Sequence, residues 1–394
     1  PLDIGRISLE PLRCPSLVGC FVKIALAQLN PTVGAIHSNA ALAMAAAEQA
    51  SRDGARLVIT PELLISGYPP KDLLLRESFV AACDHVVEEL ARALPDNIAL
   101  LVGHPTHRDV PHGRIANAAS LLHSGRVQQT AQKTLLPNYD VFDEQRYFRS
   151  GDTVRPIVYD NLRLGVHICE DAWWGEPDTF YHDPGSPRPD PVAELAAGGV
   201  DLLVNLSASP FELDKPGRRI ELGRRHAAAH GLPLAFVNQV GGNDDLVFDG
   251  QSFLLDSHGS LVTCLPAFEE SLAVIDTDAL PASIPGQPLD RESALFDALT
   301  LGLRDYMNKC GFTDCLLGLS GGIDSAVAAC IAAQAVGPAH VHGLLMPSRF
   351  SSDHSVSDAR ALSEALGIDH QVVAIESVHA AYTEADVVGA ELAS

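Results

Sequence analysis

The sequence Val166-His167-Ile168-Cys169-Glu170-Asp171-Ala172-Trp173-Trp174 joins an apolar run to a cysteine and two carboxylates, and the rest of the chain is organised around it. The run from Leu162 to Ile168 is apolar and β-branched, which predicts a buried strand. Cys169 follows directly, so its thiol lies where a strand gives way to a loop, and the backbone N–H of Glu170 can point the same way. A thiol beside a backbone donor can attack a carbonyl and hold the oxyanion that forms. An isolated cysteine is more often a buried structural residue.

Two further strand-like runs end in charged residues. Residues 56–60 lead to Glu62, and residues 127–132 lead to Lys133. A glutamate can take the thiol proton and return it to a leaving amine. A lysine lowers the pKa of a neighbouring thiol and neutralises an oxyanion. Glu62 or Lys133 alone is more typical of a charged surface residue. Together with Cys169, however, each follows the end of a predicted strand, and this shared setting indicates a catalytic centre.

The surrounding sequence resembles a known family. Glu62, Lys133 and Cys169 match the Glu–Lys–Cys triad of the nitrilase, or carbon–nitrogen hydrolase, superfamily. Four segments resemble more closely the glutaminase domain of glutamine-dependent NAD synthetases, and the resemblance runs from about residue 22 to the C-terminus. These segments are PELLISGYPP (61–70), LPNY (136–139), FDEQRYF (142–148) and NQVGGND (238–244).

The resemblance implies a role for several residues. Glu62 would be the base, Cys169 the nucleophile, and Lys133 with the N–H of Glu170 the oxyanion donors. Glu144 resembles the second, orienting glutamate of nitrilases. The residues implied to bind glutamine are Tyr139, Ser209 and Lys215, the last at a position where relatives can carry Arg.

Composition restricts the classes of function. At 394 residues the chain exceeds the usual size of a single core, which favours two domains. A formal charge of −23 and the lack of any basic run argue against nucleic acid or an anionic membrane as partner. The eight cysteines show no CxxC or metal-ligand spacing, which argues against zinc and disulfides and is typical of a cytoplasmic protein. We find neither an apolar run that could span a bilayer nor a signal peptide.

The order of elements predicts an α/β protein with a mixed sheet, because strands alternate with helices and two hairpins intervene. We expect helices from Ser38 to Asp53 and over 72–93, and a loop over 175–191. By resemblance, the fold is the four-layer α-β-β-α nitrilase sandwich over 22–276. Residues 277–290 are a proline-rich linker candidate, 291–394 a second domain, and 1–21 an extension without a structural role.

A second site is expected at Ser320-Gly321-Gly322-Ile323-Asp324-Ser325, between a strand over 313–319 and an alanine-rich helix to about 335. Glycines let a backbone close around an anion, and a helix N-terminus adds N–H groups. The pattern is neither a Walker A loop nor GxGxxG. It resembles the PP-loop of ATP pyrophosphatases, which implies ATP binding by Gly318, Leu319, Ser320, Gly321, Gly322, Ile323, Asp324 and Ser325.

The second domain is expected to be a partial doubly wound parallel α/β (PP-loop ATP pyrophosphatase) domain. By resemblance, residues 346–354 lie beside the adenine, and a βαβαβ run ends at a strand over 371–375. The family's synthetase domain continues beyond this point with a Thr-Gly-Asn-Lys-type motif that the 394 residues lack. The sequence therefore reads as part of a longer one.

The function implied by the resemblance is glutamine-dependent NAD synthesis, with glutamine, ATP and deamido-NAD as substrates. Mg²⁺ would enter with ATP, no prosthetic group is expected, and a homo-oligomer is implied. One alternative is a stand-alone nitrilase-type amidase, against which the PP-loop argues. Two others are a chain limited to the glutaminase half-reaction and a silent assembly subunit.

Overall fold

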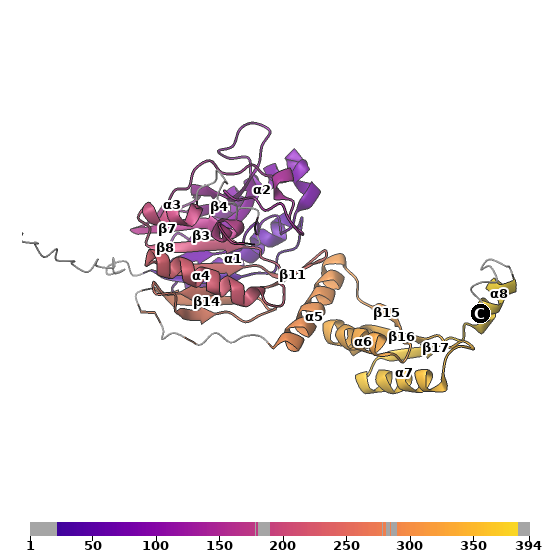
Figure 1. The fold of residues 1–394 in the computed structure, drawn as a ribbon. Helices are drawn as coiled ribbons and strands as arrows, with labels where there is room; N and C mark the ends of the chain where they lie inside the picture. The colour runs from indigo at the N-terminus through magenta and orange to yellow at the C-terminus, as the bar shows by residue number, and fades with distance from the viewer. Residues whose placement is uncertain are drawn as a thin grey trace, which may run out of the picture. The chain divides into compact units, whose positions relative to one another are not determined.

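The computed structural model describes residues 22–177, 179, 190–277, 279–280, 284 and 290–384. The chain divides into two compact units. The first comprises the described residues of Pro1–Gly241 and Phe248–Pro288, and the second those of Gly242–Val247 and Leu289–Ser394. Figure 1 colours the chain from indigo at the N-terminus to yellow at the C-terminus. The expected extension (1–21) and most of the expected linker (277–290) and loop (175–191) lie outside the described residues.

Two six-stranded mixed sheets form the first unit. The first sheet has the order β14-β1-β2-β3-β4-β5, with bounds β1 (Lys23–Gln28), β2 (Leu57–Ile59), β3 (Ala99–Thr106), β4 (Ala116–His123), β5 (Arg126–Gln132) and β14 (Ser271–Asp276). The second has the order β13-β12-β9-β8-β7-β6, with bounds β6 (Ile157–Tyr159), β7 (Leu162–Ile168), β8 (Leu202–Ser207), β9 (Leu234–Asn238), β12 (Phe253–Leu255) and β13 (Leu261–Cys264).

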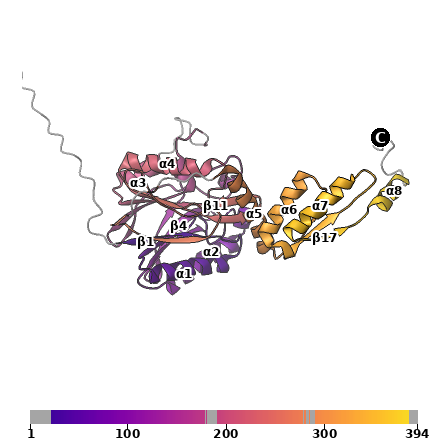
Figure 2. The ribbon, with the colours of Figure 1, turned by 90° about the horizontal axis from the view of Figure 1, so that it is seen from below.

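Helices cover the outer face of each sheet, as Figure 2 shows. Helices α1 (Ile36–Arg52) and α2 (Glu77–Ala93) lie against the first sheet, and α3 (Pro191–Ala197) and α4 (Lys215–His230) against the second. A third apolar cluster, which includes Leu26, Leu164 and Val204, fills the space between the sheets. Alternating strand positions supply the two faces of each sheet. The predicted four-layer α-β-β-α fold is confirmed.

Some element boundaries differ from the prediction. Helix α1 begins at Ile36 without a side-chain cap, so Ser38 lies inside the helix. The helix expected over 72–93 is a 3₁₀ turn, η1 (Lys71–Leu75), followed by α2, because Arg76 between them has an extended backbone. Strand β14 was not predicted; it pairs antiparallel with β1, with Lys23 opposite Asp276.

The second unit holds a parallel three-stranded sheet of order β15-β16-β17, with bounds β15 (Cys315–Gly318), β16 (Val341–Leu345) and β17 (Asp369–Val372). Its helices are α5 (Arg291–Cys310), α6 (Ile323–Val336), α7 (Asp353–Leu366) and α8 (Glu376–Glu384), with the 3₁₀ turn η4 (Pro338–His340) before β16. Alanines of α6 and α7 pack on β16, which gives the predicted βαβαβ run, although its last strand is Asp369–Val372 and not 371–375.

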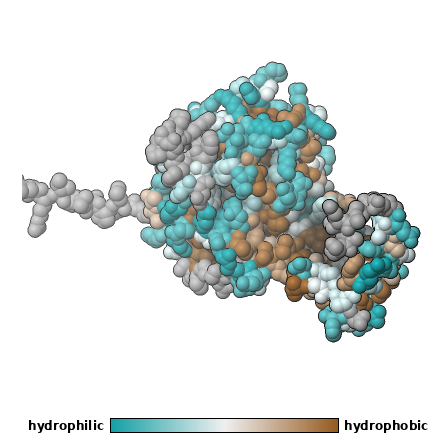
Figure 3. Space-filling model, turned by 45° about the vertical axis from the view of Figure 1, so that its right-hand side comes forward, coloured by the Kyte–Doolittle hydropathy of each residue, from teal (hydrophilic) through white to brown (hydrophobic). Residues whose placement is uncertain are grey.

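The hairpin of β10 (Val240–Asn243) and β11 (Leu246–Asp249) contributes its tip to the second unit. Gly242 donates its N–H to Asp305 of α5 (2.7 Å), and Lys309 donates to the carbonyl of Gly242 (2.9 Å). Hydrophobic side chains, brown in Figure 3, lie among hydrophilic ones on the surface of the second unit. Among the large hydrophobic residues that the structure describes, Ile323 and Phe350 are the most exposed. Among the described residues, no helix is both long and apolar enough to cross a membrane.

Candidate active site

Cys169 is the first residue of the 3₁₀ helix η3 (Cys169–Trp173), directly after β7. Its φ of +42° lies in the left-handed region, which is uncommon for a residue other than glycine. Such strain is often found at functional sites, where the surrounding structure holds it in place. The side chain is almost fully buried, at the end of the apolar cluster between the sheets.

Glu62 lies in the turn after β2 and is 1% exposed. The turn packs onto β3 at Gly103, where a Cβ atom would lie 2.4 Å from the carbonyl oxygen of Pro61. A side chain at 103 would therefore displace the turn that carries Glu62. The Oε2 atom of Glu62 accepts the N–H of Ala208 (3.0 Å), which ties the first sheet to the end of β8 in the second.

Lys133 follows β5 and is also 1% exposed. Its Nζ donates to Glu62 Oε1 (2.8 Å) and to Glu144 Oε1 (2.9 Å), and Asn117 donates to the same oxygen of Glu62 (2.7 Å). Burial lowers the pKa of Lys133, but the charges of Glu144 and Glu62 outweigh it and raise the pKa above its ordinary value. The ammonium is therefore charged and held between two carboxylates.

Glu144 accepts a second bond from the hydroxyl of Tyr68 (2.9 Å), and its other oxygen, Oε2, is buried without a hydrogen-bond partner among the described residues. Burial raises the pKa of Glu144 to about 7, although the nearby Lys133 lowers it. An unpaired, buried acceptor is costly unless a ligand supplies a donor.

The surroundings of the Cys169 thiol favour its protonated form. Burial raises its pKa well above the ordinary value, and the charge of Glu62 raises it further, while Lys133 lowers it. Reaction as a thiolate therefore needs a base close by. Glu62 is placed for this role because its charge acts on the thiol and its oxygens are already fixed by three donors.

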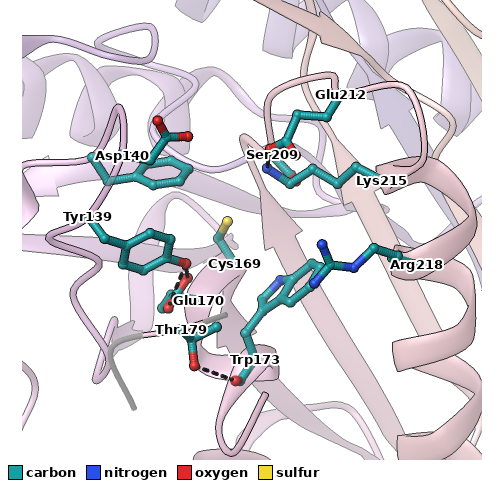
Figure 4. Close-up of a pocket in the computed structure, with 11 residues that line it drawn as sticks. Tyr139, Asp140, Cys169, Glu170, Trp173, Thr179, Ser209, Glu212, Lys215 and Arg218 are labelled. Carbon is teal, nitrogen blue, oxygen red and sulfur yellow. Dashed lines mark hydrogen bonds and ion pairs between the residues drawn. The ribbon is translucent and has the colours of Figure 1, made fainter. Parts of the chain in front are cut away.

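A cavity of about 200 Å³ opens over Cys169. Figure 4 shows the sulfur directed into the space between Tyr139 and the side chains of Lys215 and Arg218. The cavity joins the end of β7, the loop after Lys133 and the start of α4. Its lining residues are Tyr139, Asp140, Phe142, Cys169, Glu170, Trp173, Thr179, Ser209, Glu212, Lys215 and Arg218.

The three residues implied to bind glutamine all line this cavity. The hydroxyl of Tyr139 donates to the carboxylate of Glu170 (2.9 and 3.0 Å), whose pKa is raised by burial to about 7. Ser209 is held through its backbone N–H by Asn238 (2.9 Å). Lys215 forms an ion pair with Glu212 (2.8 Å), so the cavity wall presents an ammonium and a carboxylate next to each other, as a zwitterionic ligand requires.

Sequence reasoning missed several residues of this site. Asn117 and Tyr68 fix the two carboxylates, and Asp171 bonds to the loop after Lys133. Asn117 is an inward-facing residue of β4, and no local pattern marks it as different from a core amide. Asp140, Glu212 and Arg218 were also missed, because surface charges on loops and helix starts are common.

The predicted ATP site forms a separate, glycine-rich turn between β15 and α6. Gly321 has a φ of +79°, and a Cβ there would lie 2.3 Å from the carbonyl oxygen of Ser355 at the start of α7. Ser320 and Ser325 bond to each other (3.0 Å) and brace the turn. A cavity of about 310 Å³ adjoins it, lined by Leu319, Gly321, Gly322, Ile323, Ser325, Ala326, Asp358, Ala359 and Leu362. Gly318, Ser320 and Asp324 do not line the cavity.

Two family models match the chain. The carbon-nitrogen hydrolase model matches residues 23–187 and 188–282, and the NAD synthase model matches residues 295–392. An amidase of the nitrilase superfamily from Nesterenkonia has a similar structure over 66% of this chain and 92% of its own, at 27% identity and a TM-score of 0.55.

Longer relatives match almost the whole chain. A glutamine-dependent NAD(+) synthetase from Synechocystis is 46% identical and covers 92% of this chain and 66% of its own length; one from Thermotoga maritima is 35% identical and covers 92% and 67%. The glutamine-dependent NAD+ synthetase of Acinetobacter baumannii, solved with ADP, matches at 33% identity and a TM-score of 0.84 over 93% of this chain and 67% of its own. The chain thus spans about two thirds of the length of the curated relatives it matches. It belongs to the carbon-nitrogen hydrolase family and, within it, to the glutamine-dependent NAD(+) synthetases.

Proposed function

We propose that the first unit hydrolyses glutamine to glutamate and ammonia. The observation that carries this proposal is the buried Lys133–Glu62 pair, whose charges act on the Cys169 thiol. That thiol lines a cavity whose wall also carries side chains of both charges. Glu62 takes the thiol proton while Cys169 Sγ attacks the side-chain carbonyl of glutamine. The ammonium of Lys133 and the N–H of Glu170 stabilise the oxyanion.

Collapse of the tetrahedral intermediate releases ammonia and leaves a thioester on Cys169. Glu62 gives its proton to the leaving nitrogen, then takes a proton from the water that attacks the thioester, and returns it to the departing thiolate. Glu144 is the second, orienting glutamate, and its Oε2 has no hydrogen-bond partner among the described residues. In this proposal Lys215 and Glu212 receive the α-carboxylate and the α-ammonium, and Tyr139 and Ser209 shape the pocket; that all four line the cavity supports these roles.

We propose further that the protein uses ATP to adenylate deamido-NAD, and that ammonia displaces AMP to form NAD while pyrophosphate is released. The names of the relatives and the turn at Gly321 and Gly322 support this step. Glycine N–H groups and the start of α6 provide donors for the phosphates. Mg²⁺ would enter as part of the ATP substrate complex.

We also propose action in the cytoplasm as a homo-oligomer. The six cysteines that the structure describes are all free, which is typical of proteins in a reducing compartment. The oligomer rests on the family resemblance alone.

The direct test is release of glutamate from glutamine by the purified chain and by Cys169→Ser. The proposal requires release by the first and loss of at least a thousandfold in the second. Equal rates in both proteins would refute it.

A further inference from the structure

The carboxylate of Asp171 bonds to the backbone beside two catalytic residues. Its Oδ1 accepts the N–H groups of Thr134 (2.9 Å) and Leu135 (2.8 Å), which directly follow Lys133. Its Oδ2 accepts the N–H of Ile168 (2.9 Å), which directly precedes Cys169. The side chain is 2% exposed, so bulk solvent competes little for these bonds. One buried carboxylate therefore joins the backbone next to the amine to the backbone next to the thiol.

These two backbone segments belong to different sheets. Lys133 follows β5 of the first sheet and Cys169 follows β7 of the second. Ladder hydrogen bonds set the spacing of strands within a sheet only. The apolar contacts between the sheets are not directional and tolerate small sliding movements. Directional bonds across the sheets fix an ammonium against a sulfur: Glu62 makes one to Ala208, and Asp171 makes the one between the backbone segments of Lys133 and Cys169.

We propose that Asp171 is a positioning residue that holds the Lys133 ammonium at its working place beside the Cys169 sulfur. This inference rests on the proposed glutamine hydrolysis for its catalytic consequence, but not for its effect on the thiol. Burial raises the pKa of Asp171 to about 6 although three backbone N–H groups lower it, so the buried charge is maintained against a desolvation cost.

Positioning and simple charge have opposite effects on the thiol. Lys133 lowers the pKa of Cys169, and nearby carboxylates raise it. If Asp171 acted only through its charge, Asp171→Asn would lower the pKa of Cys169. If Asp171 positions Lys133, the same variant places an amide NH₂ against backbone N–H groups, releases the lysine and raises the pKa of Cys169.

The structure offers a matched control. A polar cavity of about 400 Å³ is lined by both Asp171 and Asp152. Asp152 pairs with Arg149 at the surface and contacts neither catalytic segment in the described part of the chain. Asp152→Asn therefore makes the same chemical change at the same cavity without touching the proposed link.

The test is the rate at which Cys169 exchanges with a small neutral disulfide at fixed pH, followed by mass spectrometry of its peptide. A rise of one unit in the pKa of Cys169 lowers the fraction of thiolate about tenfold. The remaining thiolate is about threefold more nucleophilic, so the exchange rate falls only about threefold per unit of pKa. We expect slower exchange in Asp171→Asn and in Lys133→Gln. The double variant should be no slower than Lys133→Gln, because both changes act through one amine. Asp152→Asn should match the wild type.

Exchange in folded Asp171→Asn that equals or exceeds the wild-type rate would overturn the proposal. The proposal would also be overturned if the fold decrease in exchange rate of the double variant equalled the product of the decreases caused by Asp171→Asn and Lys133→Gln. If Asp171→Asn does not fold, Asp171→Ser is read in the same way, since water from the adjoining cavity can occupy the space. In glutamine hydrolysis, Asp171→Asn should lower kcat at least tenfold and change KM less than threefold. A wild type without this activity would refute the proposed function and leave the exchange test valid.

Discussion

Replacement of Lys133 by glutamine removes the only cation that contacts Glu62 and Glu144 among the described residues. The Nζ atom lies 2.8 and 2.9 Å from the two carboxylates, and a glutamine amide is shorter and carries no charge. Loss of one oxyanion donor costs about 2.7–4 kcal/mol in the transition state, a factor of 10²–10³ in turnover. We therefore expect Lys133→Gln to lower kcat at least a hundredfold.

The same change also affects stability. Breaking a buried ion pair by removing one partner costs roughly 3–5 kcal/mol, against a total stability of about 5–15 kcal/mol. Circular dichroism and thermal unfolding must therefore accompany the kinetics, which use glutamate release at several glutamine concentrations. Lys23→Gln is the matched control, because Lys23 is exposed at the start of β1. Near-normal kcat in a folded Lys133→Gln protein would refute the role of Lys133 as an oxyanion donor.

Further predictions concern the ATP turn, the carboxylate Glu144 and the amide Asn117. Gly321→Ala should weaken ATP binding at least tenfold in equilibrium titration while leaving glutamine hydrolysis unchanged, because the added Cβ would collide with the backbone of Ser355; unchanged affinity would contradict this. The ordinary pKa of Glu144 is 4.5, and its pKa in the folded protein is about 7, so between these pH values the folded state binds more protons at Glu144 than the unfolded state does. Its contribution to the stability of the fold is therefore present below pH 4.5 and is lost as the pH rises to 7. The melting temperature of Glu144→Gln should therefore rise relative to that of the wild type as the pH increases over this range. Parallel curves of melting temperature against pH for the two proteins would contradict the raised pKa of Glu144. Asn117→Ala should lower kcat about tenfold, since Glu62 loses one of three donors; an unchanged kcat would assign Asn117 to structure.

The sequence predicted the structure best where a reactive or charged residue directly follows a clear local pattern, such as an apolar run. The ends of β2, β5 and β7 could be predicted from apolar runs followed by Glu62, Lys133 and Cys169, and the glycine turn before α6 from its strand–turn–helix setting. Boundaries set by local turns, such as the break at Arg76, were placed less well. Propensity alone does not distinguish a 3₁₀ turn from the first turn of a helix.

What the sequence could not supply are contacts between distant segments. Strand β14 forms because β1 lies beside it, although about 250 residues separate them in the chain. Asp171 reads as one more acidic residue in a loop, and its link to Thr134 depends on how the two sheets stack. The unpaired oxygen of Glu144 depends on the packing of Tyr68 and Lys133 around it.

The most direct test of the central claim is covalent trapping of the nucleophile. The chain is incubated with an electrophilic glutamine analogue, digested, and analysed by mass spectrometry at all eight cysteines. We predict one adduct per chain, at Cys169, formed in step with the loss of glutamate release and slowed by excess glutamine. An adduct on another cysteine, or complete inactivation with Cys169 unmodified, would contradict the account.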